Sequence, residues 1–180
     1  MKNFLDLVKK RHSIRKYKPD PVPREMIEKC LEAARHAPTA CNKQSWKFHI
    51  VEGELKNRLV EVSLGGVFVP NKWASTVPVI AVIAMNLDLI IHRVGGKVSG
   101  VDYHMVDAGI AGEHFVLQAT ELGLGTCWIG WFNKKAVKKL LDIPAGWDVP
   151  AMIGLGFPDE EPIDKNRRHI SEISDFKADD

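Results

Sequence analysis

The chain has 180 residues, of which 45% are hydrophobic, and its formal net charge is only +2. A chain of this length is close to the size of one domain, so we expect a single domain over residues 1–180 with a substantial core. Because the charge is small and the basic residues are spread along the chain, nucleic acid is not an expected partner.

The three cysteines, Cys30, Cys41 and Cys127, include no C-x-x-C pair. An odd number of cysteines without paired spacing favours reduced thiols in a cytoplasmic protein. The start, M-K-N-F-L-D-L-V-K-K, lacks the apolar core of a signal peptide, and the longest apolar run, over residues 77–85, is far shorter than the roughly 20 residues of a membrane span. The seven histidines show neither H-x-x-x-H nor H-E-x-x-H spacing, so no metal site is predicted.

Apolar residues at helical spacing predict a short first helix over residues 4–8. The segment that follows reads R-H-S-I-R-K-Y over residues 11–17. An extended backbone there would project Arg11, Ser13 and Arg15 to one side. Two guanidinium groups around a hydroxyl suit a phosphate, because arginine donates hydrogen bonds in bidentate geometry. A basic surface turn is the alternative that this segment alone leaves open.

A second helix is predicted to begin near Pro23, which suits a first helical turn, and to end near Arg35 and His36. Cations in a last turn are favoured by the helix dipole, so we interpret His36 as a helix-end residue and not as a catalytic one. Residues 37–46 then read A-P-T-A-C-N-K-Q-S-W, which is dense in hydrogen-bonding side chains. This loop suits a polar, flat ligand, although an ordinary loop anchored by Trp46 fits the same residues.

The remaining pattern predicts an α+β fold with three or four strands amid a majority of helix. We expect strands over residues 47–52, 78–85, 126–129 and 149–156, and helices over 54–62 and 103–122. Gly109 and Gly112 would permit close packing on the longest helix. The lysines of residues 134–139 are typical of a solvated helix face. Residues 87–101 are expected to form an excursion, either over a site or as a plain surface loop.

Other chemistry finds little support in the sequence. The run G-L-G-T-C-W-I-G over residues 123–130 is not a dinucleotide-binding fingerprint, because Trp128 stands at the third glycine position and the run follows a helix. Cys41 and Cys127 are possible nucleophiles, but no neighbouring base would activate them. Glu113 and His114 are better explained as helix surface than as an acid/base pair. A basic cluster at each end of the chain and two polar loops between them suit a phosphate with an attached planar ring.

Four motifs in order carry a resemblance over nearly the whole chain: R-H-S-I-R-K-Y, A-P-T-A-C-N-K-Q-S-W, G-L-G-T-C-W-I-G, and G-F-P followed by K-N-R-R. In this order the sequence resembles the FMN-dependent nitroreductase family. The resemblance implies a nitroreductase-like α+β fold, with a central, mostly antiparallel sheet flanked by helices. It also implies an intertwined homodimer with two FMN sites at the subunit interface.

The resemblance assigns cofactor-binding roles to particular residues. Near the phosphate and the pyrimidine edge it places Arg11, Ser13 and Arg15, the backbone of His12, and from the tail Arg167 with Lys165 or Arg168. Toward the FMN of the partner subunit it places Pro38, Thr39, Ala40 and Asn42, with Gln44 near the ring. At the N5 edge it places the backbone N–H groups of Ile129 and Gly130, with Thr126 and Cys127 lining that edge.

The implied function is that of an FMN-dependent oxidoreductase that takes electrons from NADH or NADPH. By a ping-pong mechanism it would reduce nitroaromatics, quinones or related small acceptors by two electrons, without a catalytic acid or base from the protein. Two alternatives stay open: a specialised member, such as a reductive dehalogenase or a flavin-fragmenting enzyme, and a flavin-binding carrier or regulatory protein without turnover. The chain departs from the family at Ser45, where proline is common, and Trp131 and Phe132 could narrow the substrate side.

Overall fold

The computed structural model describes residues 3–65, 72–87, 100–163 and 165–178. Within these residues the helices are α1 (Phe4–Lys10), α2 (Arg24–Arg35), α3 (Gly53–Leu64), α5 (Tyr103–Glu121) and α6 (Lys134–Leu140). The strands are β1 (Trp46–Glu52), β2 (Val79–Asn86), β3 (Gly125–Ile129) and β4 (Trp147–Gly156). The segment 87–101, for which an excursion was expected, lies largely outside the described residues.

The strands form one sheet in the order β1-β2-β4-β3, and all three strand pairs are antiparallel. Each strand begins within two residues of the start predicted from the sequence. The α+β fold with a central antiparallel sheet is therefore confirmed. In the described part of the chain, no helix is both long and apolar enough to cross a membrane.

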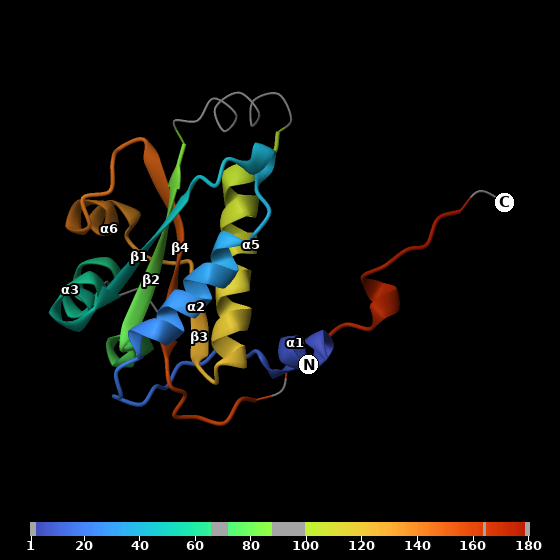
Figure 1. Ribbon diagram of the computed structural model, residues 1–180, viewed down its shortest axis with the longest axis horizontal. Coiled ribbons are helices and arrows are strands. Elements are labelled where there is room, and N and C mark those ends of the chain that lie inside the picture. Colours follow the sequence, from blue (N-terminus) through green and yellow to red (C-terminus); the bar gives the residue numbers. More distant parts are fainter. Residues whose placement is uncertain (1–2, 66–71, 88–99, 164, 179–180) are drawn as a thin grey trace.

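Helices cover the sheet on both faces (Figure 1), and β2 shows how the sequence achieves this. Val79, Ala81 and Ile83 pack in the core under α2 and α5, whereas Ile80 and Val82 pack in the core under α3 and α6. Successive side chains of a strand point to opposite faces, so a strand buried on both sides needs an unbroken apolar run. The run over residues 79–85 meets this requirement.

The two glycines that were expected to allow close packing on α5 differ from each other. A Cβ atom added at Gly112 would lie 2.1 Å from Cη2 of Trp128, so the missing side chain makes room for this indole. A Cβ atom at Gly109 would meet no atom within 4 Å. The close approach of another backbone that these glycines suggested is thus found at neither position within the described chain, and at Gly112 a side chain packs instead.

Both ends of the chain carry apolar side chains that the rest of the chain leaves exposed. Helix α1 buries none of its residues, and Phe4 is 67% exposed. After β4 the chain first pairs with residues 16–18 and then extends away from the sheet and its helices (Figure 1), and Phe176 near its end is 95% exposed. Exposed apolar side chains that gather in this way indicate contact with another molecule. The exposed set in the last segment comprises Ile163, Ile170, Ile173 and Phe176.

Candidate functional site

The basic segment 11–17 is docked on β3 and does not form a free surface turn. The N–H of Ile14 donates to the carbonyl of Thr126 over 2.8 Å, and Ser13 forms a parallel bridge to Thr126. Ile14 is buried, which leaves its neighbours Ser13 and Arg15 on the other side of the segment. Burial of one apolar side chain therefore fixes the direction of the polar ones.

Two adjoining cavities bring the two ends of the chain together. A cavity of about 150 Å³ is lined by Ser13 and Arg15, and one of about 550 Å³ by Arg11 and Arg167. Both cavities are also lined by His12 and by Lys165, which makes them neighbours. Of the three tail cations named from the sequence, the structure brings Lys165 and Arg167 to this place, whereas Arg168 lines neither cavity.

A third cavity, of about 600 Å³, shares His12 and Ile14 with the first. Two lysines, Lys10 and Lys18, line it together with three carboxylates, Asp159, Glu160 and Glu161. This balance of charge does not favour a dianion. Glu160 and Glu161 also line the cavity of about 150 Å³, whereas the described lining of the cavity of about 550 Å³ has no carboxylate. The larger cavity with Arg11 and Arg167 is therefore the better phosphate site.

The electrostatics of the site are visible at the thiol of Cys127. Burial raises the pKa of this thiol, and the positive charges of Arg15 and Lys165 oppose that rise without reversing it. The thiol is therefore neutral at physiological pH, which argues against Cys127 as a nucleophile. Carboxylates also contact the basic segment: Nε of Arg11 lies 3.9 Å from Oε1 of Glu113 on α5, and Glu160 accepts hydrogen bonds from the backbone N–H groups of Arg15 and Lys16.

The end of β3, to which the resemblance assigns the N5 edge, contributes none of the described residues that line the two cavities. Gly130 is exposed and directly follows the strand, and a Cβ atom there would meet no atom within 4 Å. Ile129 and Thr126 are buried. The carbonyl of Thr126 is used to dock the basic segment, so this residue supports the site from inside. Trp131, the next residue but one after Ile129, is 65% exposed.

The loop over residues 37–46 has an unusual backbone. Cys41, Asn42 and Gln44 have φ angles of 52°, 54° and 47°, in the left-handed region that few residues other than glycine adopt. The loop is closed on itself, because the N–H of Gln44 donates to Oγ1 of Thr39 over 3.0 Å. Backbone strain of this kind is concentrated at functional sites.

This loop does not reach the cavities of its own chain. None of the described residues that line the two cavities comes from residues 37–46. The loop lies beside the first turns of α5, whereas the basic segment runs past the other end of that helix (Figure 1). Pro38, Thr39, Ala40, Asn42 and Gln44 are thus separated from the cations with which the sequence grouped them.

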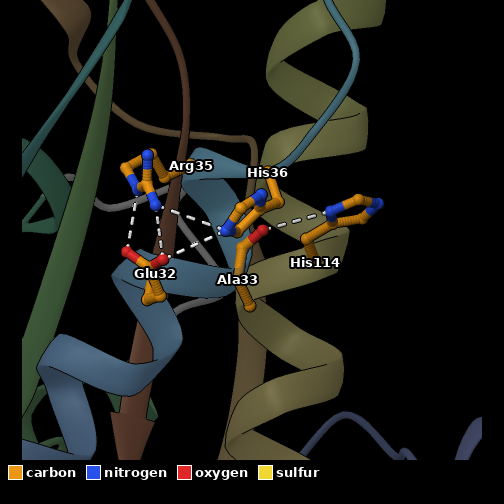
Figure 2. A network of polar contacts seen from close by, with 5 residues as sticks. All are labelled: Glu32, Ala33, Arg35, His36 and His114. Atoms are coloured by element: carbon orange, nitrogen blue, oxygen red, sulfur yellow. Dashed lines mark hydrogen bonds and ion pairs between the residues drawn. The ribbon is translucent and has the colours of Figure 1, made fainter.

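Polar contacts fix the end of α2, from which the loop starts (Figure 2). Arg35 hydrogen-bonds Glu32 and lowers the pKa of this carboxyl to about 2, and Nε2 of His36 lies 3.0 Å from the same carboxylate. On the neighbouring helix, Nδ1 of His114 lies 3.2 Å from the carbonyl oxygen of Ala33. His36 ends the helix as predicted. Glu113 and His114 contact different partners and form no acid/base pair, also as predicted.

The sequence patterns did not identify one residue that matters in this region. Asp107 on α5 is buried, and its carboxylate accepts the N–H of Ala40 in the loop. The signal that could have found it is an acidic residue at helical spacing with buried positions, since Ala111 and Phe115 follow at steps of four. A charge on the apolar stripe of a long helix requires a partner.

Comparison with known proteins identifies the family of this chain. The model of the Nitroreductase family matches residues 8–157, which is most of the chain. The chain belongs to the nitroreductase family. The family relationship predicted from the four motifs is therefore confirmed.

Other members show the same fold along the whole chain. A nitroreductase family protein from Clostridium novyi NT is 33% identical, with a TM-score of 0.77 over 88% of this chain and 86% of that one. An FMN-dependent nitroreductase from Clostridium difficile R20291 is 30% identical, with a TM-score of 0.74 over 93% of each chain. A protein named NADH dehydrogenase from Thermus thermophilus is 28% identical in an alignment of 191 positions, which covers 91% of each sequence.

Proposed function

We propose that this member of the nitroreductase family is an FMN-dependent oxidoreductase. It would take electrons from NADH or NADPH and reduce nitroaromatics, quinones or related small acceptors by two electrons. The observation that carries the proposal is the gathering of cations from both ends of the chain around two adjoining cavities. Related proteins named FMN-dependent nitroreductase and NADH dehydrogenase support the same conclusion.

The donor groups fit the chemistry of FMN. A phosphate dianion requires several charge-assisted hydrogen bonds, and Arg11, Lys165 and Arg167 line the larger cavity together. In the smaller cavity Ser13 and Arg15 offer a hydroxyl and a guanidinium to the polar edge of a ring. We therefore assign the phosphate to the larger cavity and the ring edge to the smaller one.

When bound, FMN would supply the hydride chemistry between the nicotinamide donor and the acceptor. The protein would bind and orient FMN and tune its reduction potential. The positive charge of Arg15 would stabilise negative charge on the ring edge, and the N–H groups of Ile129 and Gly130 would hold the opposite edge. No side chain of the chain is assigned a proton transfer, so we propose ping-pong kinetics set by the cofactor.

We also propose that the functional unit is a homodimer, in which the loop over residues 37–46 faces the FMN of the other subunit. Three observations support this arrangement: the loop lines neither of the two cavities that hold the cations, α1 buries none of its residues, and the last segment exposes apolar side chains such as Phe176. A shared site of this kind requires closed two-fold symmetry. The protein should therefore run as a dimer, and a stable monomer that retains FMN would contradict the shared site.

Steady-state kinetics test the proposed activity. Purified protein with FMN is mixed with NADH or NADPH and with a nitroaromatic or a quinone, and both concentrations are varied. Parallel lines in double-reciprocal plots, the pattern of a ping-pong mechanism, are the expected result. Bound FMN without oxidation of either nucleotide would instead support a carrier without turnover.

A further inference from the structure

Among the described residues, one hydrogen bond links residues 38–44 of the loop to another part of the chain. The N–H of Ala40 donates to Asp107, at 3.1 Å from Oδ1 and 3.4 Å from Oδ2. In the described part of the chain, the other hydrogen bonds of residues 38–44 stay inside this loop. These internal bonds shape the turn over residues 38–44, and Asp107 ties this turn to α5. The end of the loop is held separately, since the carbonyl of Ser45 accepts the N–H of Asn86 over 2.8 Å.

The backbone of the loop needs such a tie. Three residues without glycine's freedom, Cys41, Asn42 and Gln44, adopt left-handed φ angles. Conformations of this kind persist only where the surrounding structure holds them in place. Asp107 itself is only 3% exposed, so its carboxylate sits in a low-dielectric setting where a charge-assisted hydrogen bond is strong and its loss is costly.

Helix α5 holds both the start of the loop and the helix that leads to it. Asp107 and His114 are seven residues apart and so lie on the same face of α5. His114 contacts the carbonyl of Ala33 in the last turn of α2 (Figure 2), and Asp107 contacts Ala40, seven residues further along the chain. The same helix face thus sets the end of α2 and the position of the strained turn.

We propose that Asp107 is a positioning residue for cofactor binding: its buried carboxylate holds Ala40 and thereby places residues 38–44 against the FMN of the partner subunit. This inference rests on the proposed function, because it assumes that FMN is the ligand of the loop. Asp107 touches no reacting atom in this account. It acts through the backbone of the loop.

The hydrogen bond can be removed from either side. Asp107→Ala deletes the acceptor, and Asp107→Asn keeps an oxygen that can accept. Ala40→Pro deletes the donor without changing the helix: Thr39 already has the extended backbone (φ −141°, ψ 152°) that a residue before proline requires. Ala40 is also the first residue of a 3-10 turn, where proline is tolerated. Glu121→Gln is the matched control, since Glu121 ends the same helix and contacts only Gln118 among its described neighbours.

Two measurements decide the proposal. Amide hydrogen exchange of residues 38–44 in the FMN-free protein reports the order of the loop, with exchange in β2 as the reference for global stability. FMN titration reports the consequence for the site. Asp107→Ala and Ala40→Pro should each accelerate exchange in the loop alone and raise the Kd for FMN by on the order of 10- to 100-fold, the effect of losing one hydrogen bond to a charged group. Asp107→Asn should lie between the wild type and Asp107→Ala, because it keeps an acceptor but loses the charge. Glu121→Gln should stay close to the wild type.

The double variant separates this mechanism from general damage. If both single variants remove the same hydrogen bond, the combination should weaken FMN binding no more than either alone. Additive losses, or wild-type exchange and affinity in Asp107→Ala, would overturn the role of Asp107 while the proposed function stands. Ala40→Pro keeps the test decisive if Asp107→Ala does not fold. A wild-type protein that binds no FMN would instead overturn the proposed function, and this role of Asp107 with it.

Discussion

Alanine at the two glycines of α5 provides a matched pair of perturbations. An alanine at either position gains helix propensity of about 1 kcal/mol over glycine, so this term cancels when the two variants are compared. At Gly109 the added Cβ would meet no atom within 4 Å, whereas at Gly112 it would lie 2.1 Å from Cη2 of Trp128 and 3.1 Å from Cδ1 of Ile83. The difference between the variants therefore measures the clash with the indole.

The size of that difference follows from the geometry. Ordinary contact begins at 3.4 Å, so the indole of Trp128 would have to withdraw by 3.4 − 2.1 = 1.3 Å. Overpacking of this kind costs about 1–3 kcal/mol. We expect Gly112→Ala to be less stable than Gly109→Ala by that amount, and to bind FMN more weakly because Trp128 directly precedes Ile129 and Gly130.

Urea denaturation of both variants at one protein concentration gives the free energies of unfolding. Equal stability of Gly112→Ala and Gly109→Ala would refute the packing argument. Unchanged FMN affinity in a destabilised Gly112→Ala would refute the further step that the position of Trp128 governs the end of β3.

Three more changes test the site and the core. Arg11→Ala or Arg167→Ala should weaken FMN binding by about 1.5–3 kcal/mol in a titration, because each removes a charge-assisted contact to the phosphate. Gly125→Ala should also weaken FMN binding, since its Cβ would lie 2.8 Å from Cγ1 of Ile14 and push the basic segment off β3. Burial raises the pKa of Cys30 from 9.0 to about 12, so the folded state keeps a proton that the unfolded state releases above pH 9. The wild type should therefore lose stability between pH 9 and 12 relative to Cys30→Ala, by at most about 1.4 kcal/mol per pH unit.

The arginine variants have a matched control, and each prediction has a result that would contradict it. Arg24→Ala removes an exposed arginine that pairs with Glu28 within α2, so it should leave FMN binding unchanged. Full FMN affinity in both arginine variants would show that the phosphate is assigned to the wrong place. Full affinity in Gly125→Ala would show that the basic segment tolerates displacement. Unfolding free energies of the wild type and Cys30→Ala that run parallel from pH 9 to 12 would contradict the burial argument.

The order and type of the elements could be read from the sequence because local patterns determine them. The apolar run over residues 79–85 predicts a buried strand, and Arg35 and His36 mark the end of α2. The same patterns do not say which residues meet across the fold. Gly109 and Gly112 look alike in the sequence, and only the position of the Trp128 indole distinguishes them.

The candidate site likewise combines residues that local sequence patterns could identify with contacts across the fold that they could not. The cations of residues 11–15 and of the tail are some 150 positions apart. Their types suggested a shared phosphate, but only the resemblance to a family assigned individual residues to it before the fold was known. Thr126, expected at the ring edge, is instead the buried residue on which the basic segment docks. Asp107 escaped notice because a single acidic residue in a helix carries no motif. Its role becomes visible only with Ala40 beside it.

The central claim is that this chain binds FMN and passes electrons from a nicotinamide to a small acceptor. Anaerobic mixing of the FMN-loaded protein with NADH or NADPH tests it most directly, with the flavin absorbance as the signal. We predict that one of the nucleotides bleaches the flavin and that a nitroaromatic or a quinone then restores its absorbance. Failure to bind FMN at micromolar concentration, or a bound flavin that neither nucleotide bleaches, would contradict the claim.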